Sequence, residues 1–200
     1  VRFPGVMART VFKLSDGRDY KQGVEHAAVS AQRVAMVTRD KRLRVFARPG
    51  FAVLLDVRFD KRVEDVALSP DGRRVAVGVD DTGLHIFDIT TGKRVTAAGD
   101  DVQGLSFSPD GGEVFGREDH GPRVVDSKSG RVLRSYGNHE WTRASVYARA
   151  DLVATVGSSK LRLYRSGVGK PYDLPTPERM WSLSAVAASP DGNMVCGSSS

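Results

Sequence analysis

Apolar and polar residues alternate in short runs along the chain, and turn residues separate the runs. Residues 66–68, 74–78, 84–88 and 94–96 show the pattern, with glycine, proline or aspartate standing between successive runs. Runs this short, bounded by turn residues, are typical of β-strands, because an amphipathic helix needs a longer stretch with a period of about 3.6 residues. The pattern predicts an all-β protein of many short strands.

These runs repeat with a period of about forty residues. The sequence Ser-Pro-Asp-Gly begins at Ser69, Ser108 and Ser189, at separations of 39 (108 − 69) and 81 (189 − 108) residues. Because 81 is about two periods, a degenerate copy is expected near residue 148, and residues 145–157 fit it. Residues 27–37 fit in the same way one period before Ser69. A fixed period of this length indicates a repeat architecture.

The repeated tetrapeptide has the chemistry of a tight turn. Proline fixes its own φ, aspartate binds nearby backbone N–H groups, and glycine accepts a positive φ without steric cost. Four short strands in about forty residues make one blade of a β-propeller, so we predict a propeller of such blades. The turn positions expected to be structural are Asp71, Gly72, Asp110, Gly111, Asp191 and Gly192.

Residues 66–95 resemble a WD repeat in outline. They contain a strand, the Ser-Pro-Asp-Gly turn, a second strand ending in glycine, an acidic loop residue, and a third strand with a hydrophobic–aromatic–Asp sequence. Phe87 and Asp88 stand where the family has its Trp-Asp pair, and Asp126 ends a weaker match. The resemblance is to WD-repeat propellers of the WD40-like or YVTN-like kind, and it extends over nearly the whole chain.

The resemblance implies further structural positions. The family's loop aspartate, six residues before the tryptophan position (87 − 81), maps to Asp40, Asp81 and Asp119. The Gly-His pair that opens many WD repeats is absent, and residues 138–139 are the nearest approximation, so the hydrogen-bonded tetrad of strong WD repeats is expected to be partial. The glycine-rich and arginine-rich style looks like the bacterial members of the family.

The spacing divides the chain into four full units and two half units. The units are residues 1–23 (a second half), 24–62, 63–100, 101–140, 141–181 and 182–200 (a first half). The chain is placed as beginning near a third strand because residues 11–18 resemble residues 86–93. Either the two halves join to close a five-bladed ring, which would remove exposed sheet edges, or the chain is a fragment of a larger ring. The initial Val1 and the Gly-Ser-Ser-Ser end favour the fragment.

Positive charge is concentrated early in the chain. The net charge is +6, and much of the excess lies between Arg39 and Arg74. Such a region would suit nucleic acid or another acidic partner. The charges are not interleaved with aromatic residues in the manner of single-strand binding surfaces, and Arg42 and Arg44 alternate with apolar neighbours as outward strand positions do. We expect solvated strand surfaces, with nucleic-acid binding through this basic third as an alternative.

The chain carries no recognisable pattern of a catalytic, metal or cofactor site. Cys196 is the single cysteine, which excludes an intrachain disulfide and a cysteine-based zinc cluster. The four histidines lack metal-ligand spacing, and the nucleophile-elbow, P-loop and Rossmann sequences are missing. The acidic pairs at 80–81 and 100–101 lack the alternating acids of a calcium loop and are expected to be exposed turn residues. The sequence predicts no enzyme, no cofactor and no small-molecule substrate.

An enzymatic or carrier propeller is the alternative from another class. Residues 88–93 also resemble a turn of quinoprotein propellers that bind pyrroloquinoline quinone, but residues 94–97 lack the docking tryptophan of those repeats. Trp141 and Trp181 are 40 residues apart (181 − 141), which favours a shared structural position over two binding anchors.

Together these features predict a non-catalytic binding module. A rigid propeller presents loops to another macromolecule, and the WD-repeat resemblance implies a protein partner and a scaffolding role. No apolar run approaches the roughly 18–20 residues of a membrane helix. The cytoplasm is the favoured compartment.

Overall fold

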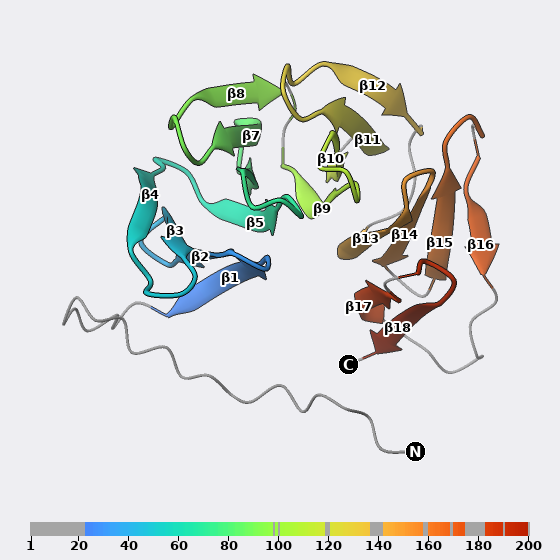
Figure 1. Ribbon diagram of the computed structural model, residues 1–200. Helices are drawn as coiled ribbons and strands as arrows, with labels where there is room; N and C mark the ends of the chain where they lie inside the picture. Colours follow the sequence, from blue (N-terminus) through green and yellow to red (C-terminus); the bar gives the residue numbers. More distant parts are fainter. Residues whose placement is uncertain are drawn as a thin grey trace.

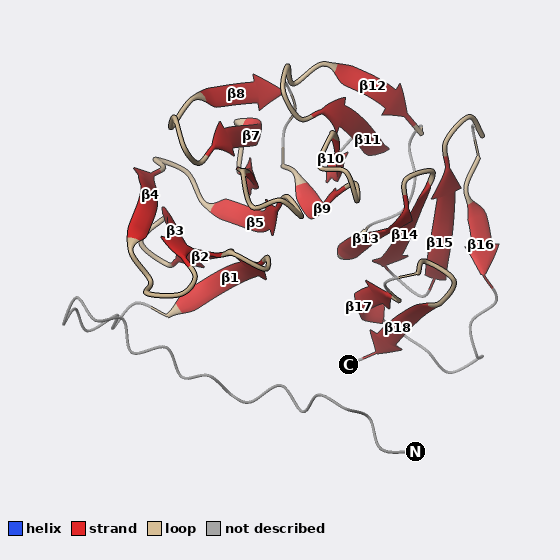
Figure 2. Ribbon diagram, viewed as in Figure 1, coloured by secondary structure: helices blue, strands red, loops and turns tan. Residues whose placement is uncertain are grey.

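The computed structural model describes residues 23–97, 99, 101–118, 121–136, 142–157, 160–168, 170–174, 183–189 and 191–199. These residues form 18 β-strands and no helix (Figure 2). None of them therefore forms a helix long and apolar enough to span a membrane. The half unit predicted for residues 1–23 lies outside the described residues, except for Gly23.

The strands pair into four antiparallel sheets of four strands and one sheet of two. Blade 1 contains β1 (Val24–Val29), β2 (Arg33–Thr38), β3 (Arg42–Ala47) and β4 (Val53–Arg58). Blade 2 contains β5 (Val63–Leu68), β6 (Arg74–Val79), β7 (Gly83–Asp88) and β8 (Arg94–Ala97). Blade 3 contains β9 (Gln103–Phe107), β10 (Glu113–Glu118), β11 (Gly121–Asp126) and β12 (Val132–Ser135). Blade 4 contains β13 (Ala144–Arg149), β14 (Leu152–Gly157), β15 (Lys160–Arg165) and β16 (Tyr172–Leu174), and the two-stranded sheet contains β17 (Leu183–Ala188) and β18 (Val195–Ser199).

The sheets follow one another around an arc (Figure 1). The first strand of each sheet lies on the inner side of the arc and the fourth strand of each four-stranded blade on the outer side. First strands of neighbouring sheets are in contact, from β1 to β5, β9, β13 and β17. The predicted architecture of an all-β array of four-stranded propeller blades is confirmed, whereas the number of blades in a complete ring stays a prediction.

Neighbouring blades pack against each other through the faces of their sheets, and this packing determines which strand residues are buried. In blade 2 nearly every residue of β6 and β7 is buried, because neighbouring blades cover both faces of the sheet. The outer strand β4 instead alternates exposed with half-buried residues. Strands covered on both faces need continuous apolar runs, and strands covered on one face need only alternation. The mixture of both patterns in the sequence therefore reflects the depth of each strand within its blade.

The core consists of apolar layers between blades rather than one central mass. The layer between blades 1 and 2 includes Val45, Val75 and Phe87, and Phe59 packs its ring on Phe87 with centroids 6.1 Å apart. The layer between blades 3 and 4 is aromatic, with Tyr164 fully buried. Burying a large apolar side chain contributes about 1.5–3 kcal/mol, so each blade depends on its neighbour for stability. The aromatic members of that layer are Phe115, Tyr136, Tyr147 and Tyr164.

Candidate interaction face

The blades present two ends, which differ in how their polar residues are used. Because the strands run antiparallel, the turns after first and third strands lie at one end, and the loops after second and fourth strands lie at the other. We call the first end the turn face and the second the loop face. Among the described residues, the turn face comprises 30–32, 48–52, 69–73, 89–93, 108–112, 127–131, 150–151, 166–168, 170–171, 189 and 191–194. The loop face comprises 39–41, 59–62, 80–82, 99, 101–102, 136 and 142–143.

On the turn face, each Ser-Pro-Asp-Gly turn is closed by its own side chains. The Ser108 hydroxyl donates to Asp110 Oδ1 at 2.6 Å and accepts from the Glu113 amide at 2.9 Å. The Gly112 amide donates to the same Asp110 oxygen at 2.9 Å. The hydrogen bonds from Ser108 and Gly112 lower the pKa of Asp110. Gly111 has φ of +71°, a conformation that glycine adopts without strain.

The hydrogen bond from serine to aspartate recurs in the other two copies of the turn. Ser69 donates to Asp71 Oδ1 at 2.6 Å, and Ser189 donates to Asp191 Oδ1. The glycines of these turns, Gly72 and Gly192, have φ of +68° and +69°. Three copies of one geometry support the structural role proposed for the tetrapeptide.

The turns after third strands are braced by the aspartate that ends the strand. Asp88 Oδ1 accepts hydrogen bonds from the amides of Thr90 and Thr91 at 3.0 and 2.8 Å, and from the Thr91 hydroxyl at 2.9 Å. Asp126 accepts the same set from Lys128 and Ser129. These bonds, led by the Thr91 amide, lower the pKa of Asp88. Both carboxylates are thus committed to their own turns, while Phe87, next to Asp88, is buried in the layer between blades 1 and 2.

An aspartate that the sequence analysis missed joins blade 2 to blade 3. Asp65 lies on the innermost strand β5, where its carboxylate accepts from the Leu105 amide at 2.8 Å and from the Val66 amide at 2.7 Å. Burial raises the pKa of Asp65, although these hydrogen bonds act in the opposite direction. One blade further, the Ser106 hydroxyl accepts from the Tyr147 amide at 3.0 Å. The sequence signal was a pair of acids, Glu64 and Asp65, at the start of a run that is otherwise apolar over 63–68.

Both ring nitrogens of His85 form hydrogen bonds within blade 2. Its Nε2 lies 3.0 Å from the Thr82 hydroxyl and its Nδ1 lies 3.0 Å from the Thr96 hydroxyl, so both ring nitrogens have partners. Burial lowers the pKa of His85, and the Arg94 charge acts in the same direction. The neutral imidazole can accept from one threonine and donate to the other. This arrangement makes His85 a buried structural bridge between the loop at 82 and strand β8.

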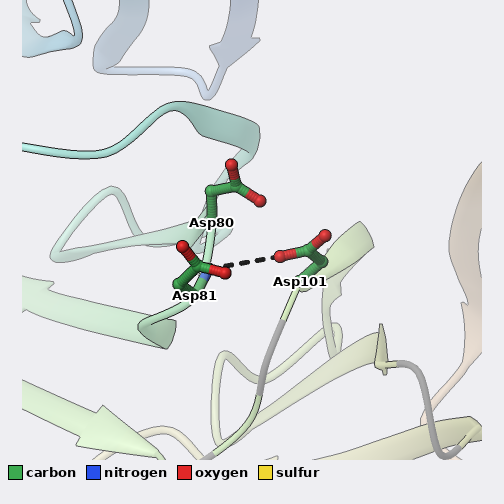
Figure 3. Close-up of side chains that lie close together, drawn as sticks. All are labelled: Asp80, Asp81 and Asp101. Atoms are coloured by element: carbon green, nitrogen blue, oxygen red, sulfur yellow. Dashed lines mark hydrogen bonds between the residues drawn. The ribbon is translucent and has the colours of Figure 1, made fainter.

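The loop face gathers three carboxylates that the sequence analysis treated as separate pairs. Oxygen atoms of Asp80, Asp81 and Asp101 all lie within 4.8 Å of one another (Figure 3). The Asp81 amide donates to Asp101 Oδ1 at 3.2 Å, and the Asp81 carboxylate binds the Lys61 ammonium at 2.6 Å. Hydrogen bonding to Asp101 and the neighbouring negative charges raise the pKa of Asp80. Calcium needs six to eight oxygen ligands, so this cluster by itself is not a cation site.

Cationic side chains of blade 1 border this acidic cluster. Lys61 links the two regions through Asp81, and Lys41 donates to the Asp60 carbonyl oxygen at 2.7 Å. A shallow cavity of about 260 Å³ opens beside Lys41. Its lining residues are Arg39, Asp40, Lys41, Arg58, Phe59 and Asp60.

The loop aspartates expected from the WD-repeat resemblance differ from one another. Asp40 accepts from the Thr38 hydroxyl within its own loop, whereas the exposed Asp81 binds Lys61 of the preceding linker. Asp119 lies outside the described residues, as do Trp141 and Trp181. The hydrogen-bond network of these loops is therefore not the same in each blade.

Residues 27–99 match the model of a known protein family, the anaphase-promoting complex subunit 4 WD40 domain. The matched range runs from the middle of β1 to the residues that follow β8, and so it covers most of blade 1 and all strands of blade 2. No curated protein matches the chain. The match and the four-stranded antiparallel sheets agree on repeat units of the WD40 type.

Proposed function

We propose that this chain, an array of WD40-type propeller blades, is a non-catalytic scaffold that binds a protein partner through its loop face. The observation that carries the proposal is the contrast between the two ends of the blades. The turn-face carboxylates of Asp71, Asp88, Asp110 and Asp126 are each held by hydrogen bonds within their own turns. On the loop face the carboxylates of Asp80, Asp81 and Asp101 instead lie together, and Asp81 pairs with Lys61 of a different loop.

An exposed charged side chain that does not stabilise a turn can release its bound water and bind a partner's charged group without disturbing the fold. Lys61 and Asp81, although paired, keep 52% and 66% of their side chains exposed. A surface salt bridge of this kind contributes only about 0–1 kcal/mol, so a partner could replace it. Adjacent positive and negative regions fit a partner segment that carries both charges in the matching order, because complementary charge sets both register and association rate.

Ion pairs within the protein weaken the alternative that the basic first third of the chain binds nucleic acid. Arg42 and Arg44 both contact Asp56, at 2.6 and 3.3 Å, and Arg44 has only 10% of its side chain exposed. Arg62 lies 3.3 Å from Glu64. These arginines are partly neutralised within the protein, and a phosphate backbone would have to compete with their carboxylates.

Matched charge reversals can test the proposal. The wild-type chain, Lys61→Glu, Asp81→Lys and the turn-face variant Lys93→Glu would be used to capture partners from a lysate of the source organism. We expect a protein that wild type and Lys93→Glu retain, that both loop-face variants lose, and whose retention falls with added salt. A partner that all four proteins retain equally would contradict the loop face, and the absence of any such protein would contradict the scaffold role.

A further inference from the structure

A small cavity opens on the turn face where blades 2 and 3 meet. Its polar lining residues are Arg74, Asp88 and Lys93 of blade 2 and Ser127 and Lys128 of blade 3. The volume of the cavity is about 150 Å³. Pockets for drug-sized ligands have volumes of about 300–1,000 Å³, so this cavity has room for a small chemical group and not for a whole cofactor.

The side chains that line this cavity carry more positive than negative charge. Three of them are cations, Arg74, Lys93 and Lys128, and one is an acid, Asp88, which gives a net charge of +2 (3 − 1). None of the three cations forms an ion pair with a carboxylate in the part of the chain that the structure describes. A concave site lined mainly by charges of one sign raises the local concentration of ions of the opposite sign. The cavity therefore attracts anions.

Arg74 is held in place at the junction of the two blades. Its Nη1 donates to the Ser127 hydroxyl at 3.3 Å, and that hydroxyl donates to the carbonyl oxygen of Gly111 at 2.7 Å. Ser127 is buried, so its hydroxyl is a fixed partner. A guanidinium has five N–H donors, and one of them has an acceptor among the described residues. The remaining donors can bind an anion at a small cost in side-chain entropy, because the arginine is already ordered.

The one acid in the lining, Asp88, does not neutralise these cations. Its Oδ1 accepts hydrogen bonds from the amides of Thr90 and Thr91 and from the Thr91 hydroxyl. The Thr91 amide is the main cause that lowers the pKa of Asp88, and the Arg74 charge acts in the same direction without an ion pair between the two side chains. An anion in the cavity would therefore meet three cations, whereas the carboxylate is held by its own turn.

Two apolar residues complete the lining of the cavity. Ile86 is buried in the apolar layer between blades 2 and 3, and Val95 is half-buried on β8. Apolar walls lower the local dielectric constant, so a contact between charges beside them is stronger than the same contact on an open surface. The cavity thus differs from a group of lysines on a flat, solvated face.

The three cations occur together at one of the three junctions between four-stranded blades. The first residues of the second strands in blades 1 to 3 are Arg33, Arg74 and Glu113. The residues whose carbonyl oxygens accept from the last amide of each third strand are Ala52, Lys93 and Arg131. The second residues after the third strand of the following blade are Thr90, Lys128 and Gly167. At these positions the other two junctions carry one cation each, and one of them also carries an acid, so the fold of the repeat does not require three cations.

We propose that this cavity binds a phosphate group with close to two negative charges, carried either by inorganic phosphate or by a phosphorylated serine or threonine of a protein. Such a group has a charge of about −1.5 to −2 at pH 7 and three strong acceptor oxygens, which match the net charge of +2 and the three cations. A carboxylate carries one charge, and so does each phosphodiester of a nucleic acid, so both match the cavity less well. The site lies on the turn face and does not depend on the loop-face proposal.

An NMR titration of the backbone amides in the full chain tests the proposal. The titrants are inorganic phosphate, a short phosphoserine peptide and the same peptide without phosphate, all at one ionic strength set with sodium chloride. Phosphate and the phosphopeptide should shift the amides of Ser127 and Lys128 to saturation, and the unmodified peptide should not. Arg74→Gln and Lys128→Thr should each weaken binding about tenfold, because each removes a charge-assisted contact. The control Arg131→Ala removes an exposed cation outside the cavity and should change the affinity by less than about twofold.

The titrants also distinguish the two sources of the phosphate group. A phosphopeptide that binds more tightly than inorganic phosphate identifies a phosphorylated protein, and equal affinities identify free phosphate; both results support the site. The proposal is overturned if neither titrant shifts these amides, or if Arg131→Ala weakens binding as much as the two cavity variants do. A single-stranded oligonucleotide that binds through the same residues and more tightly than the phosphopeptide would also overturn it, in favour of a nucleic-acid backbone.

The variants keep this test separate from folding and from the loop-face proposal. If circular dichroism shows that Arg74→Gln does not fold, Lys128→Thr decides, since the Lys128 side chain is exposed on a turn. Lys93→Glu should lose phosphate binding but retain the partner expected at the loop face. Either proposal can therefore fail while the other stands.

Discussion

The carboxylate of Asp65 accepts a hydrogen bond from the Leu105 amide, 40 residues further along the chain, at 2.8 Å. A second amide, that of Val66, binds the other oxygen of the same carboxylate. The group lies between the innermost strands of blades 2 and 3, where the side chain of Asp65 is half-buried. This single side chain therefore satisfies two backbone donors of adjoining blades.

Replacing Asp65 should weaken the junction of blades 2 and 3. Asp65→Ala leaves two buried N–H groups without an acceptor, which should lower the free energy of unfolding by about 3 kcal/mol. Urea denaturation followed by circular dichroism measures the change. Asp60→Ala, on the exposed loop face, is the control and should change the free energy by less than about 0.5 kcal/mol. Equal effects of the two substitutions would contradict the bridging role.

The position of Gly78 tolerates no side chain. A Cβ at this position would lie 1.8 Å from the carbonyl oxygen of Val102, which belongs to the backbone of the next blade. Gly78→Ala should therefore separate the two blades and cost about 3 kcal/mol or more, which corresponds to a Tm decrease of roughly 6–12 °C for a chain of this size. Gly23→Ala is the matched control, since its Cβ would have no atom closer than 3.8 Å. Equal Tm values for both variants would show that the interface is looser than described.

His85 should make stability depend on pH. Its pKa in the folded protein is lowered by burial, so below the ordinary histidine pKa of about 6.5 the unfolded chain takes up a proton that the folded chain excludes. The contribution of the neutral imidazole is complete above pH 6.5 or so and is lost as the pH falls toward the folded pKa, with a slope of at most about 1.4 kcal/mol per pH unit. Urea denaturation between pH 5 and 8 measures this slope.

The matched variant for this prediction is His85→Gln, whose side chain can also bind Thr82 and Thr96 but does not titrate. It should show a shallower decline of stability below pH 6.5 than wild type. Parallel profiles for the two proteins would mean that His85 does not contribute to the pH dependence.

The two Ser-Pro-Asp-Gly turns at Ser108 and Ser189 should differ in their importance. Ser108 is 2% exposed and its hydroxyl both donates to Asp110 and accepts from the Glu113 amide. Ser108→Ala should cost about 1–2 kcal/mol, because the half-buried Glu113 amide loses its acceptor. Ser189→Ala should cost less, because water can replace the hydroxyl in the more exposed turn. A larger effect at Ser189, measured by urea denaturation, would contradict this order.

The sequence made the elements and the repeating turns predictable because their causes are local. Phe87 and the Asp71 and Asp110 turns could be recognised from neighbours only a few residues away. The role of Asp65 could not be recognised in this way, because its partner is a backbone amide of the next blade. The relative position of two neighbouring blades cannot be deduced from the sequence of either strand. The acidic cluster was missed for the same reason, since Asp101 joins Asp80 and Asp81 only when blades 2 and 3 are in place.

The polar junctions between blades recur at almost the period of the sequence. Asp65 reaches Leu105 across 40 residues, and Ser106 reaches Tyr147 across 41. Blade 3 thus contacts blade 2 through the Leu105 amide and blade 4 through the Ser106 hydroxyl. A duplication or deletion of one whole period in the gene would preserve these junctions, whereas a change of half a period would place strands against loops. Such arrays can therefore gain or lose length in steps of one blade during evolution.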